Sequence, residues 1–557
     1  MAGFTRPYRM EDKKMDRYGL IPRPRERREE PGSFKLTENT EIIYRDSSLE
    51  PIAHYLRNQL ETETSLKLRV TGPASGPRKG HGASSIILLS LDSTKDGTAG
   101  NPYKKSEAYT LKVSANEVSI VGSDRAGVFY GCQSLIQLAG TVTGGFARLA
   151  HFAGFFTRKE RTIPAVTIRD YPEVSWRGMM LDIARHFFPK EYILKFIDIL
   201  ALHKLNRLHL HLTDDQGWRI QIDSYPRLTE VGSWRTERGE RYGGFLSKDD
   251  IKEIVDYAGS RFIEVIPEID MPGHVQAALA AYPELSCDWC DNKEYRVKED
   301  YGISEEVFCV GQEETYRFVE GILKEVAELF PSPYMHIGGD ECPTVQWEKC
   351  SVCNAKLREL GLKSYRGLQG YFEKRVSDIV TGLGKIPVAW DEVGELEGLK
   401  DIIVMYWRRE KPLQDLLKKS LLKKGLSIII ADNGYFYFDY PQSQVELRLA
   451  GVKLDFHIPN TPTKKTYSYD YDSLSESERK LILGMQGQIW TEFVENVERL
   501  EYMVLPRLCA LAEVCWLPES LREWPSFKKR MKLHGKRLSR RGIGYNRHVS
   551  FWEAKVE

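Results

Sequence analysis

The pattern of hydrophobic and polar positions along the chain changes near residue 169. Before this point, strand-length apolar runs are interspersed with two longer segments, 51–61 and 126–138, that have helical patterns. The strands predicted in this first part cover residues 43–44, 85–91, 109–113 and 117–121. Such a mixture of short strands and helices predicts one small α+β domain over residues 20–168.

After residue 169, apolar strands alternate with amphipathic helices. In the segment 191–202, for example, apolar side chains recur at the i, i+3, i+4, i+7 spacing of a buried helix face. The predicted strands cover 178–183, 207–212, 264–269, 334–337, 387–390, 402–406, 427–431 and 485–489. The predicted helices cover 191–202, 248–261, 313–330, 365–383 and 498–514, the last one kinked at Pro506.

Eight strands that alternate with helices over ~340 residues are typical of a (β/α)₈ TIM barrel. We therefore predict an α/β fold with such a barrel over residues 169–545, preceded by the small α+β domain. A doubly wound open sheet is the rival, but no Gly-rich phosphate-binding motif follows the first predicted strand. Residues 1–19 and 546–557 are expected to be a charged N-terminal tail and a C-terminal tail.

Composition and charge exclude several classes of partner. Of the 557 residues, 41% are hydrophobic and 29% are charged, which is typical of a globular protein. The net charge is +1, so we expect neither nucleic acid nor an anionic membrane as a partner. No run reaches the ~20 apolar residues of a membrane span. Because the N-terminus resembles no secretory leader, we expect a cytoplasmic protein, or a secreted one if a leader is missing from this sequence.

Nine cysteines include two CxxC pairs, Cys287/Cys290 and Cys350/Cys353. Two such pairs are able to hold a structural Zn²⁺, although the segment between them is long for a zinc ribbon. Cys309 and Cys342 lie nearby in the sequence as competing partners. Free thiols, a disulfide and zinc therefore all stay open, ranked in that order, and the sequence predicts neither a metal nor a cofactor.

Polar and aromatic side chains follow nearly every predicted barrel strand. In a (β/α)₈ barrel, the carboxyl ends of the strands form the active-site face. The residues at these ends include Asp182, Arg185, Asp214, Asp270, His274, Asp340, Glu341, Trp390, Trp407, Tyr437, Asp439, Trp490 and Glu492. Each desolvated, unpaired polar group costs about 1–3 kcal/mol, so their accumulation at one end predicts a functional site. Carboxylates and aromatics without a phosphate-binding loop favour carbohydrate chemistry.

Asp340 and Glu341 are the strongest candidates for catalysis. Glycosidic cleavage needs a carboxylic acid to protonate the leaving oxygen and negative charge to stabilise an oxocarbenium-like centre. Adjacent side chains at a strand end diverge, so these two can face different atoms of one sugar. Gly338 and Gly339, which precede them, allow the backbone and a ligand to approach closely.

Four motifs resemble those of glycoside hydrolase family 20, the β-N-acetylhexosaminidases. They are DIARHF at 182–187, HLHLTDDQGW at 209–218, EIDMPGH at 268–274 and HIGGDE at 336–341. The segment AGVFYGCQSLIQL at 126–138 resembles the small α+β domain that precedes the barrel in that family. The resemblance covers residues 20–545, and its four motifs occur in the family's order.

The resemblance implies an exo-acting glycoside hydrolase that removes terminal β-linked GlcNAc or GalNAc with retention. The nucleophile in this family is the substrate's own acetamido group, which forms an oxazolinium intermediate. The family pattern makes Glu341 the general acid and then the general base. It makes Asp340 the group that orients the acetamido N–H, and Tyr437 the donor to the acetamido oxygen.

The resemblance also assigns substrate contacts and supporting residues. The expected substrate-binding residues are Arg185, Trp390, Trp407, Asp439, Trp490 and Glu492. Asp214, Asp270 and His274 match the residues that orient the acid and the arginine. The expected partner is an oligosaccharide substrate, and a homodimer is compatible with the fold. Two alternatives stay open: a disaccharide-releasing enzyme of the same family, and a non-catalytic carbohydrate-binding protein on this fold.

Overall fold

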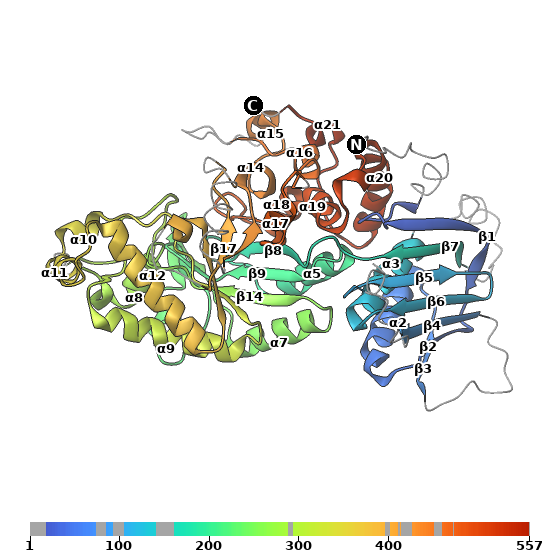
Figure 1. The fold of residues 1–557 in the computed structure, drawn as a ribbon, viewed down its shortest axis with the longest axis horizontal. Coiled ribbons are helices and arrows are strands. Elements are labelled where there is room, and N and C mark those ends of the chain that lie inside the picture. The colour runs from blue at the N-terminus through green and yellow to red at the C-terminus, as the bar shows by residue number, and fades with distance from the viewer. Residues whose placement is uncertain are drawn as a thin grey trace.

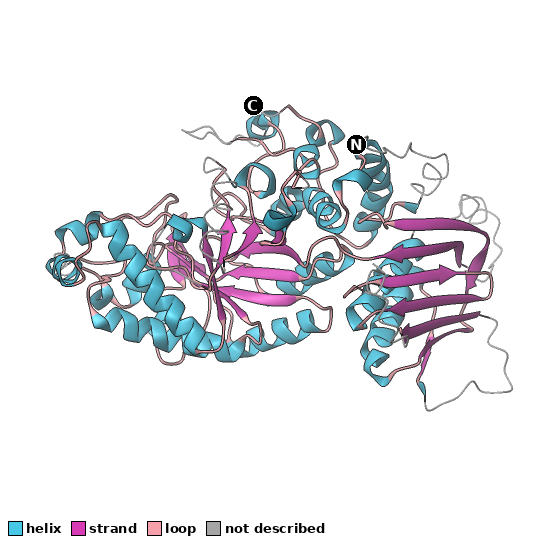
Figure 2. Cartoon of the chain, in the orientation of Figure 1, coloured by secondary structure: helices cyan, strands magenta, loops and turns pink. Residues whose placement is uncertain are grey.

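The computed structural model describes residues 18–73, 85–92, 105–140, 161–287, 293–395, 401–409, 413, 426–449, 459–471 and 473–555. A seven-stranded sheet with two helices stands beside a closed barrel surrounded by helices (Figures 1 and 2). Most of the N-terminal segment predicted as a tail lies outside the described residues. Among the described residues, no helix combines the length and the apolar character that a membrane crossing requires.

The N-terminal sheet has the strand order β1-β7-β5-β6-β4-β2-β3. Its strands are β1 (Glu26–Leu36), β2 (Thr40–Tyr44), β3 (Arg69–Thr71), β4 (Ser85–Leu91), β5 (Tyr109–Val113), β6 (Glu117–Gly122) and β7 (Arg161–Asp170). The predicted bounds of β4 and β5 agree with these. The strands β1, β3 and β7 were not predicted, and β7 runs two residues past the predicted end of this domain.

Two helices, α2 (Glu50–Thr64) and α3 (Arg125–Ala139), cover the face of this sheet that lies toward the barrel (Figure 1). Asp124 caps α3 by accepting a hydrogen bond from the Gly127 amide. From Gly127 to Ala139 every residue of α3 is buried, including its glutamines. The helix is buried on all sides because it lies between the sheet and the barrel. Phe129 contacts Phe262 of the barrel domain, for example, with ring centroids 5.3 Å apart.

The second part of the chain forms the predicted (β/α)₈ barrel. Eight parallel strands close in the order β14-β15-β16-β17-β18-β19-β8-β9. They are β8 (Trp176–Asp182), β9 (Arg207–His211), β14 (Glu264–Glu268), β15 (Tyr334–His336), β16 (Ile386–Trp390), β17 (Ile403–Tyr406), β18 (Ser427–Ile430) and β19 (Ile482–Gly487). Closure of the barrel confirms the predicted fold and excludes the doubly wound rival.

Amphipathic helices surround the barrel and bury one face each. They include α5 (Lys190–Leu202), α7 (Lys248–Gly259), α9 (Glu313–Leu329) and α12 (Tyr365–Gly382). The predicted helix 498–514 is divided into α18 (Val497–Val504) and α19 (Arg507–Trp516). The division falls at Pro506, which has no amide hydrogen to continue the first helix.

The C-terminal helix α20 (Trp524–Arg540) binds the N-terminal end of the described chain. Arg530 pairs with the buried Glu513 through two bonds of 2.6 and 2.7 Å and also donates to the carbonyl of Leu20. The segment 546–557, predicted as a tail, contains the short helix α21 (Val549–Trp552), whose Trp552 is buried.

Candidate active site

The predicted site residues lie at the carboxyl ends of the barrel strands and in the loops that follow. The turn after β15 carries the carboxyl pair. Gly338 and Gly339 have φ values of 70° and 96°, and Glu341 has a φ of 44°, all in the left-handed region. A Cβ atom at Gly338 would lie 1.7 Å from Oδ1 of Asp270, so only glycine fits this position. The turn therefore approaches the β14 loop closely and fixes the direction of both carboxyls.

His274 lies between the two carboxyls. Its Nε2 is 3.8 Å from Oδ2 of Asp340 and 3.7 Å from Oε2 of Glu341. Its Nδ1 is 3.3 Å from Oδ1 of Asp214. Burial alone would lower the pKa of His274, but the carboxylates of Asp214, Asp340 and Asp270 raise this pKa well above its usual value. The imidazole therefore carries a positive charge beside the carboxyl pair.

The environments of Asp340 and Glu341 differ. Asp340 is buried, whereas the side chain of Glu341 is 37% exposed. Burial and the neighbouring Asp340 raise the pKa of Glu341, and His274 opposes this shift. Burial and Asp340 also raise the pKa of Asp270 well above its usual value. Of this group of acids, Glu341 combines a raised pKa with access to solvent.

Arg185 occupies a carboxylate-rich corner after β8. Its Nη2 lies 2.7 Å from Oδ2 of Asp214, and its guanidinium stands 4.9 Å from the centre of a Trp490 ring. Asp182 accepts hydrogen bonds from the Arg185 amide and from Thr491, which joins the first and last strands of the barrel. Burial lowers the pKa of Arg185, but Asp214, Glu492 and Asp182 raise it well above the usual value. The arginine is thus charged and held rigidly.

Glu268 connects a network that the sequence did not reveal. This fully buried carboxylate contacts His209, His211 and His336 and accepts a 2.9 Å hydrogen bond from Nε1 of Trp390. Burial raises its pKa, but His336 and His211 outweigh burial and lower the pKa well below the usual range. The only signal in the sequence was the alternation of His209 and His211 along one strand, whereas the register that pairs His211 with Glu268 is seen only in the structure. Glu268 therefore fixes the orientation of Trp390.

The aromatic residues line a common wall. Trp407 and Tyr437 stack with an interplanar angle of 12° and ring centroids 6.1 Å apart. Trp490 lies 5.7 Å from Trp390 and 6.2 Å from Tyr437 between ring centroids. Trp390 is almost fully buried, whereas Trp407 and Trp490 are partly exposed. The structure thus brings together all three predicted tryptophans and the predicted tyrosine.

Two acidic groups complete the wall near Trp490. Burial, followed by the charge of Glu492, raises the pKa of Asp439 well above its usual value. Oδ1 of Asp439 makes no hydrogen bond within the described residues. Glu492 is partly exposed. Burial raises its pKa above the usual value, although the charge of Arg185 opposes this shift. All twelve predicted site residues therefore belong to one continuous cluster at the carboxyl end of the barrel.

Comparison with known families shows to which family the two parts of the chain are similar. Residues 174–519 match the catalytic domain of glycosyl hydrolase family 20, and residues 17–171 match domain 2 of the same family. The chain belongs to glycosyl hydrolase family 20. The family predicted from the four motifs is thus confirmed, and the enzyme class is glycoside hydrolase.

Relatives of this family 20 chain share both of its parts. A β-hexosaminidase from Porphyromonas gingivalis is 36% identical over 95% of this chain, which spans 64% of that relative's length. A Vibrio harveyi exo-β-N-acetylglucosaminidase, solved in complex with N-acetylglucosamine, superposes with a TM-score of 0.80 at 29% identity, covering 95% of this chain and 78% of its own. A Streptomyces coelicolor β-N-acetylhexosaminidase superposes with a TM-score of 0.78 at 30% identity, covering 95% of this chain and 98% of its own.

A second carboxylate missed by sequence reasoning lies behind the aromatic wall of this family 20 site. Glu392 accepts a 3.0 Å hydrogen bond from Nε1 of Trp407. Burial, then the charges of Asp340 and Asp391, raise its pKa to about 9. Its only signal in the sequence was its position, since Glu392 follows β16. Its structural effect is to fix the plane of Trp407.

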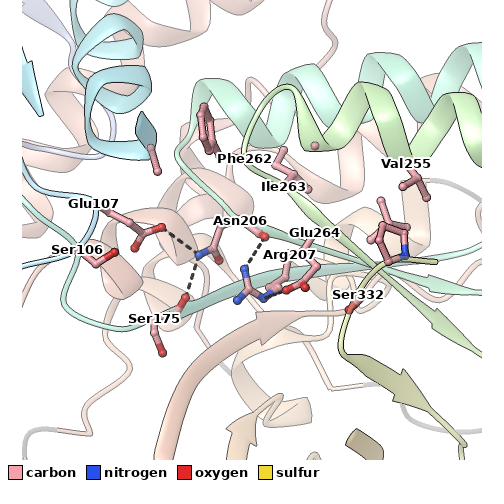
Figure 3. Close-up of a pocket in the computed structure, with 14 residues that line it drawn as sticks. Ser106, Glu107, Ser175, Asn206, Arg207, Val255, Phe262, Ile263, Glu264 and Ser332 are labelled. Atoms are coloured by element: carbon pink, nitrogen blue, oxygen red, sulfur yellow. Dashed lines mark hydrogen bonds and ion pairs between the residues drawn. The ribbon is translucent and has the colours of Figure 1, made fainter. Parts of the chain in front are cut away.

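A cavity of about 550 Å³ lies at the opposite end of the barrel from the family 20 site (Figure 3). Its lining includes residues that precede barrel strands, such as Ser175, Asn206 and Ser332, and Glu107 from the N-terminal domain. Asn206 donates hydrogen bonds there to Glu107 and to the carbonyl of Ser175. Because none of the predicted site residues lines this cavity, we interpret it as a gap between the domains.

Proposed function

We propose that this protein is a retaining exo-β-N-acetylhexosaminidase that uses the acetamido group of its substrate as the nucleophile. The observation that carries this proposal is the pairing of Asp340 and Glu341, which share His274 but differ in burial. An exposed acid with a raised pKa and a buried carboxylate beside it suit two distinct tasks in one reaction.

In the proposed reaction, Glu341 donates its proton to the glycosidic oxygen of the leaving group. Burial and Asp340 raise the pKa of Glu341 and so favour its protonated form before the reaction. The acetamido carbonyl oxygen attacks the anomeric carbon as the glycosidic bond breaks, and an oxazolinium ion forms. Glu341, now ionised, then takes a proton from the water that attacks the anomeric carbon. Two inversions at this carbon give net retention.

Asp340 stabilises the positive charge that develops on the acetamido group. Its Oδ1 is buried and makes no hydrogen bond within the described residues, so it is available to accept one from the acetamido N–H. A fixed carboxylate in a desolvated site stabilises such charge more strongly than water does. Tyr437 is assigned as the donor to the acetamido oxygen. Burial is the main cause that raises the pKa of Tyr437 well above its usual value, which keeps the hydroxyl protonated.

The sugar itself is proposed to rest against the aromatic wall. Trp390, Trp407 and Trp490 would contact the acetamido methyl and the apolar face of the ring. Arg185, Glu492 and Asp439 would bind hydroxyls of the terminal sugar. Arg185 is held by Asp214 and Asp182, so it loses little conformational freedom when it binds.

We infer exo action from the family resemblance, with Arg185, Glu492 and Asp439 holding the terminal sugar of the substrate. The Vibrio harveyi neighbour, described as an exo-acting β-N-acetylglucosaminidase, supports this choice. Release of a disaccharide and binding without cleavage are the competing hypotheses.

The test compares an aryl β-GlcNAc glycoside with the matching aryl β-glucoside, which lacks the acetamido group. We expect rapid release from the GlcNAc compound alone, with the β-anomer appearing first by NMR. Equal rates on both would refute the role of the acetamido group. If neither compound reacts, aryl glycosides of the disaccharide separate a disaccharide-releasing enzyme, which cleaves them, from a binding protein, which does not.

A further inference from the structure

Four buried cysteines converge on one point outside the proposed active site. Cys287, Cys309, Cys350 and Cys353 are each at most 2% exposed, and their sulfur atoms all lie within 4.8 Å of one another. Cys287 follows α8 (Gln276–Ala281), Cys309 precedes α9, and the other two begin α11 (Ser351–Glu359). Cys309 thus joins three of the four cysteines of the CxxC pairs, whereas Cys290 lies outside the described residues.

The spacing of the sulfurs fits a tetrahedral metal site. Sγ of Cys309 is 3.8 Å from Sγ of Cys350 and 3.6 Å from Sγ of Cys353. Four thiolates at about 2.3 Å from a central Zn²⁺ lie about 3.8 Å apart along each edge of the tetrahedron. A disulfide would need about 2.05 Å, so neither of these two contacts is a sulfur–sulfur bond.

The backbone beside the cluster offers groups that stabilise a negatively charged sulfur. Sγ of Cys350 caps α11 and accepts a hydrogen bond from the amide of Cys353, 3.4 Å away. This contact places an N–H dipole and a helix N-terminus beside the sulfur, and both stabilise a thiolate. A Cβ atom at Gly311 would lie 2.8 Å from the Cys353 backbone, so glycine allows the chain after Cys309 to approach α11.

We propose that Cys287, Cys309, Cys350 and Cys353 form a structural tetrathiolate site for one Zn²⁺ ion. Four protein ligands fill the coordination sphere, so the site leaves no position for water and is structural rather than catalytic. Zinc suits it because thiolates select soft and borderline cations over Mg²⁺ or Ca²⁺. The proposal is independent of the hydrolase assignment, since none of these cysteines contacts the carboxyl pair.

The four-cysteine cluster lies close in the structure to the loops that carry Glu341 and His274. Cys350 lies nine residues after Glu341, with α10 (Val345–Lys349) between them. Trp347 of this helix donates a 2.8 Å hydrogen bond to the carbonyl of Phe308, the residue before Cys309. The Phe308 amide in turn donates to the carbonyl of Pro272, 3.0 Å away in the loop after β14. Zinc would therefore tie together the loops that carry Glu341 and His274.

The first experiment measures metal in the full chain, purified without chelators and without a metal-affinity tag. We expect about one zinc per chain by elemental analysis, as for other four-cysteine structural sites. Exchange of this zinc for Co²⁺ should give the visible absorption of tetrahedral cobalt bound by thiolates. A folded protein that holds less than ~0.1 zinc per chain and gives no such absorption would overturn the proposal. A disulfide between any two of the four cysteines, found by non-reducing peptide mapping, would also overturn it.

Substitutions test the identity of the ligands. Cys309→Ser and Cys353→Ser should each lower the zinc content about tenfold, because a three-thiolate site binds far more weakly. Cys132→Ser is the matched control, since Cys132 is equally buried but lies in α3 of the other domain. Should the cluster variants fail to fold, titration of the wild-type chain with a mercurial decides the question. Zinc must then be released in step with the modification of four thiols, and release of zinc without thiol modification refutes the assignment.

Discussion

Gly338→Ala tests whether the turn after β15 depends on the absence of a side chain. At φ 70°, the left-handed backbone costs an alanine about 1–2 kcal/mol. The added Cβ would also lie 1.7 Å from Oδ1 of Asp270, so the Asp270 carboxyl must move away. This movement breaks the hydrogen bond from the Gly339 amide to Asp270. Leaving these buried groups unpaired adds about 1–3 kcal/mol, for a total of about 2–5 kcal/mol.

Gly384→Ala is the matched control for this change. Gly384 has a similar φ of 75°, but nothing lies within 4 Å of its Cβ position, so only the backbone cost applies. Thermal unfolding should place the midpoint of Gly338→Ala below that of Gly384→Ala. Hydrolysis of an aryl β-GlcNAc glycoside should fall in Gly338→Ala alone, because Asp340 and Glu341 follow the same turn. Equal midpoints together with equal activity would refute the steric reasoning.

Three further predictions concern ionisable groups in and near the site. Glu341→Gln should lower turnover about 10²- to 10⁴-fold on substrates with poor leaving groups and less on activated aryl glycosides; equal losses on both would contradict a general acid. His274 lowers the pKa of Glu341, so His274→Gln should move the alkaline limb of the kcat/KM pH profile to higher pH. An alkaline limb at the wild-type pH would show that His274 does not set the pKa of the catalytic acid. Burial is the main cause that raises the pKa of Glu373 from 4.5 to about 8, so the folded state holds a proton that the unfolded state releases. The stability that Glu373 contributes is therefore full below pH 4.5 and falls by about 1.4 kcal/mol per pH unit up to pH 8. Glu373→Gln should accordingly unfold at a higher temperature than wild type at pH 8 but not at pH 4. Unfolding temperatures of the two proteins that change in parallel with pH would refute this prediction.

The barrel was predictable because its strands are buried on both faces and its helices on one. Strands such as β17 and β18 are therefore largely apolar runs, and the helices between the barrel strands have a 3.6-residue apolar period. The strand β1 was not predictable in this way, because its sequence ERREEPGSFKL is mostly charged and contains Pro31. Its pairing with β7 is interrupted between Glu29 and Ser33, and this irregularity disrupts the alternation that marks a strand.

The location of the candidate site was predictable, since closure of the barrel brings the carboxyl ends of its strands together. The contacts that each side chain makes within the site were not predictable. Glu268 belongs to the EIDMPGH motif, but its contacts with three histidines from other strands follow only from the register of the barrel. The sequence indicates Cys309 only as a competing partner, because it has no CxxC spacing of its own. It reaches Cys350 and Cys353 through packing of segments about 40 residues apart.

The burial of α3 from Gly127 to Ala139 has a consequence for how the molecule unfolds. Tyr130 of this helix accepts a hydrogen bond from Arg177 in β8, and Gln137 donates to the carbonyl of Leu202 at the end of α5. Arg177 also pairs with Glu107 of the N-terminal domain through two bonds of 2.9 Å. Separation of the two parts would expose the apolar surface of α3 and leave the buried Arg177 without its carboxylate. We therefore expect the sheet and the barrel to unfold as one cooperative unit, and a cut between them to remove contacts that α3 makes with the barrel domain, such as that of Phe129 with Phe262.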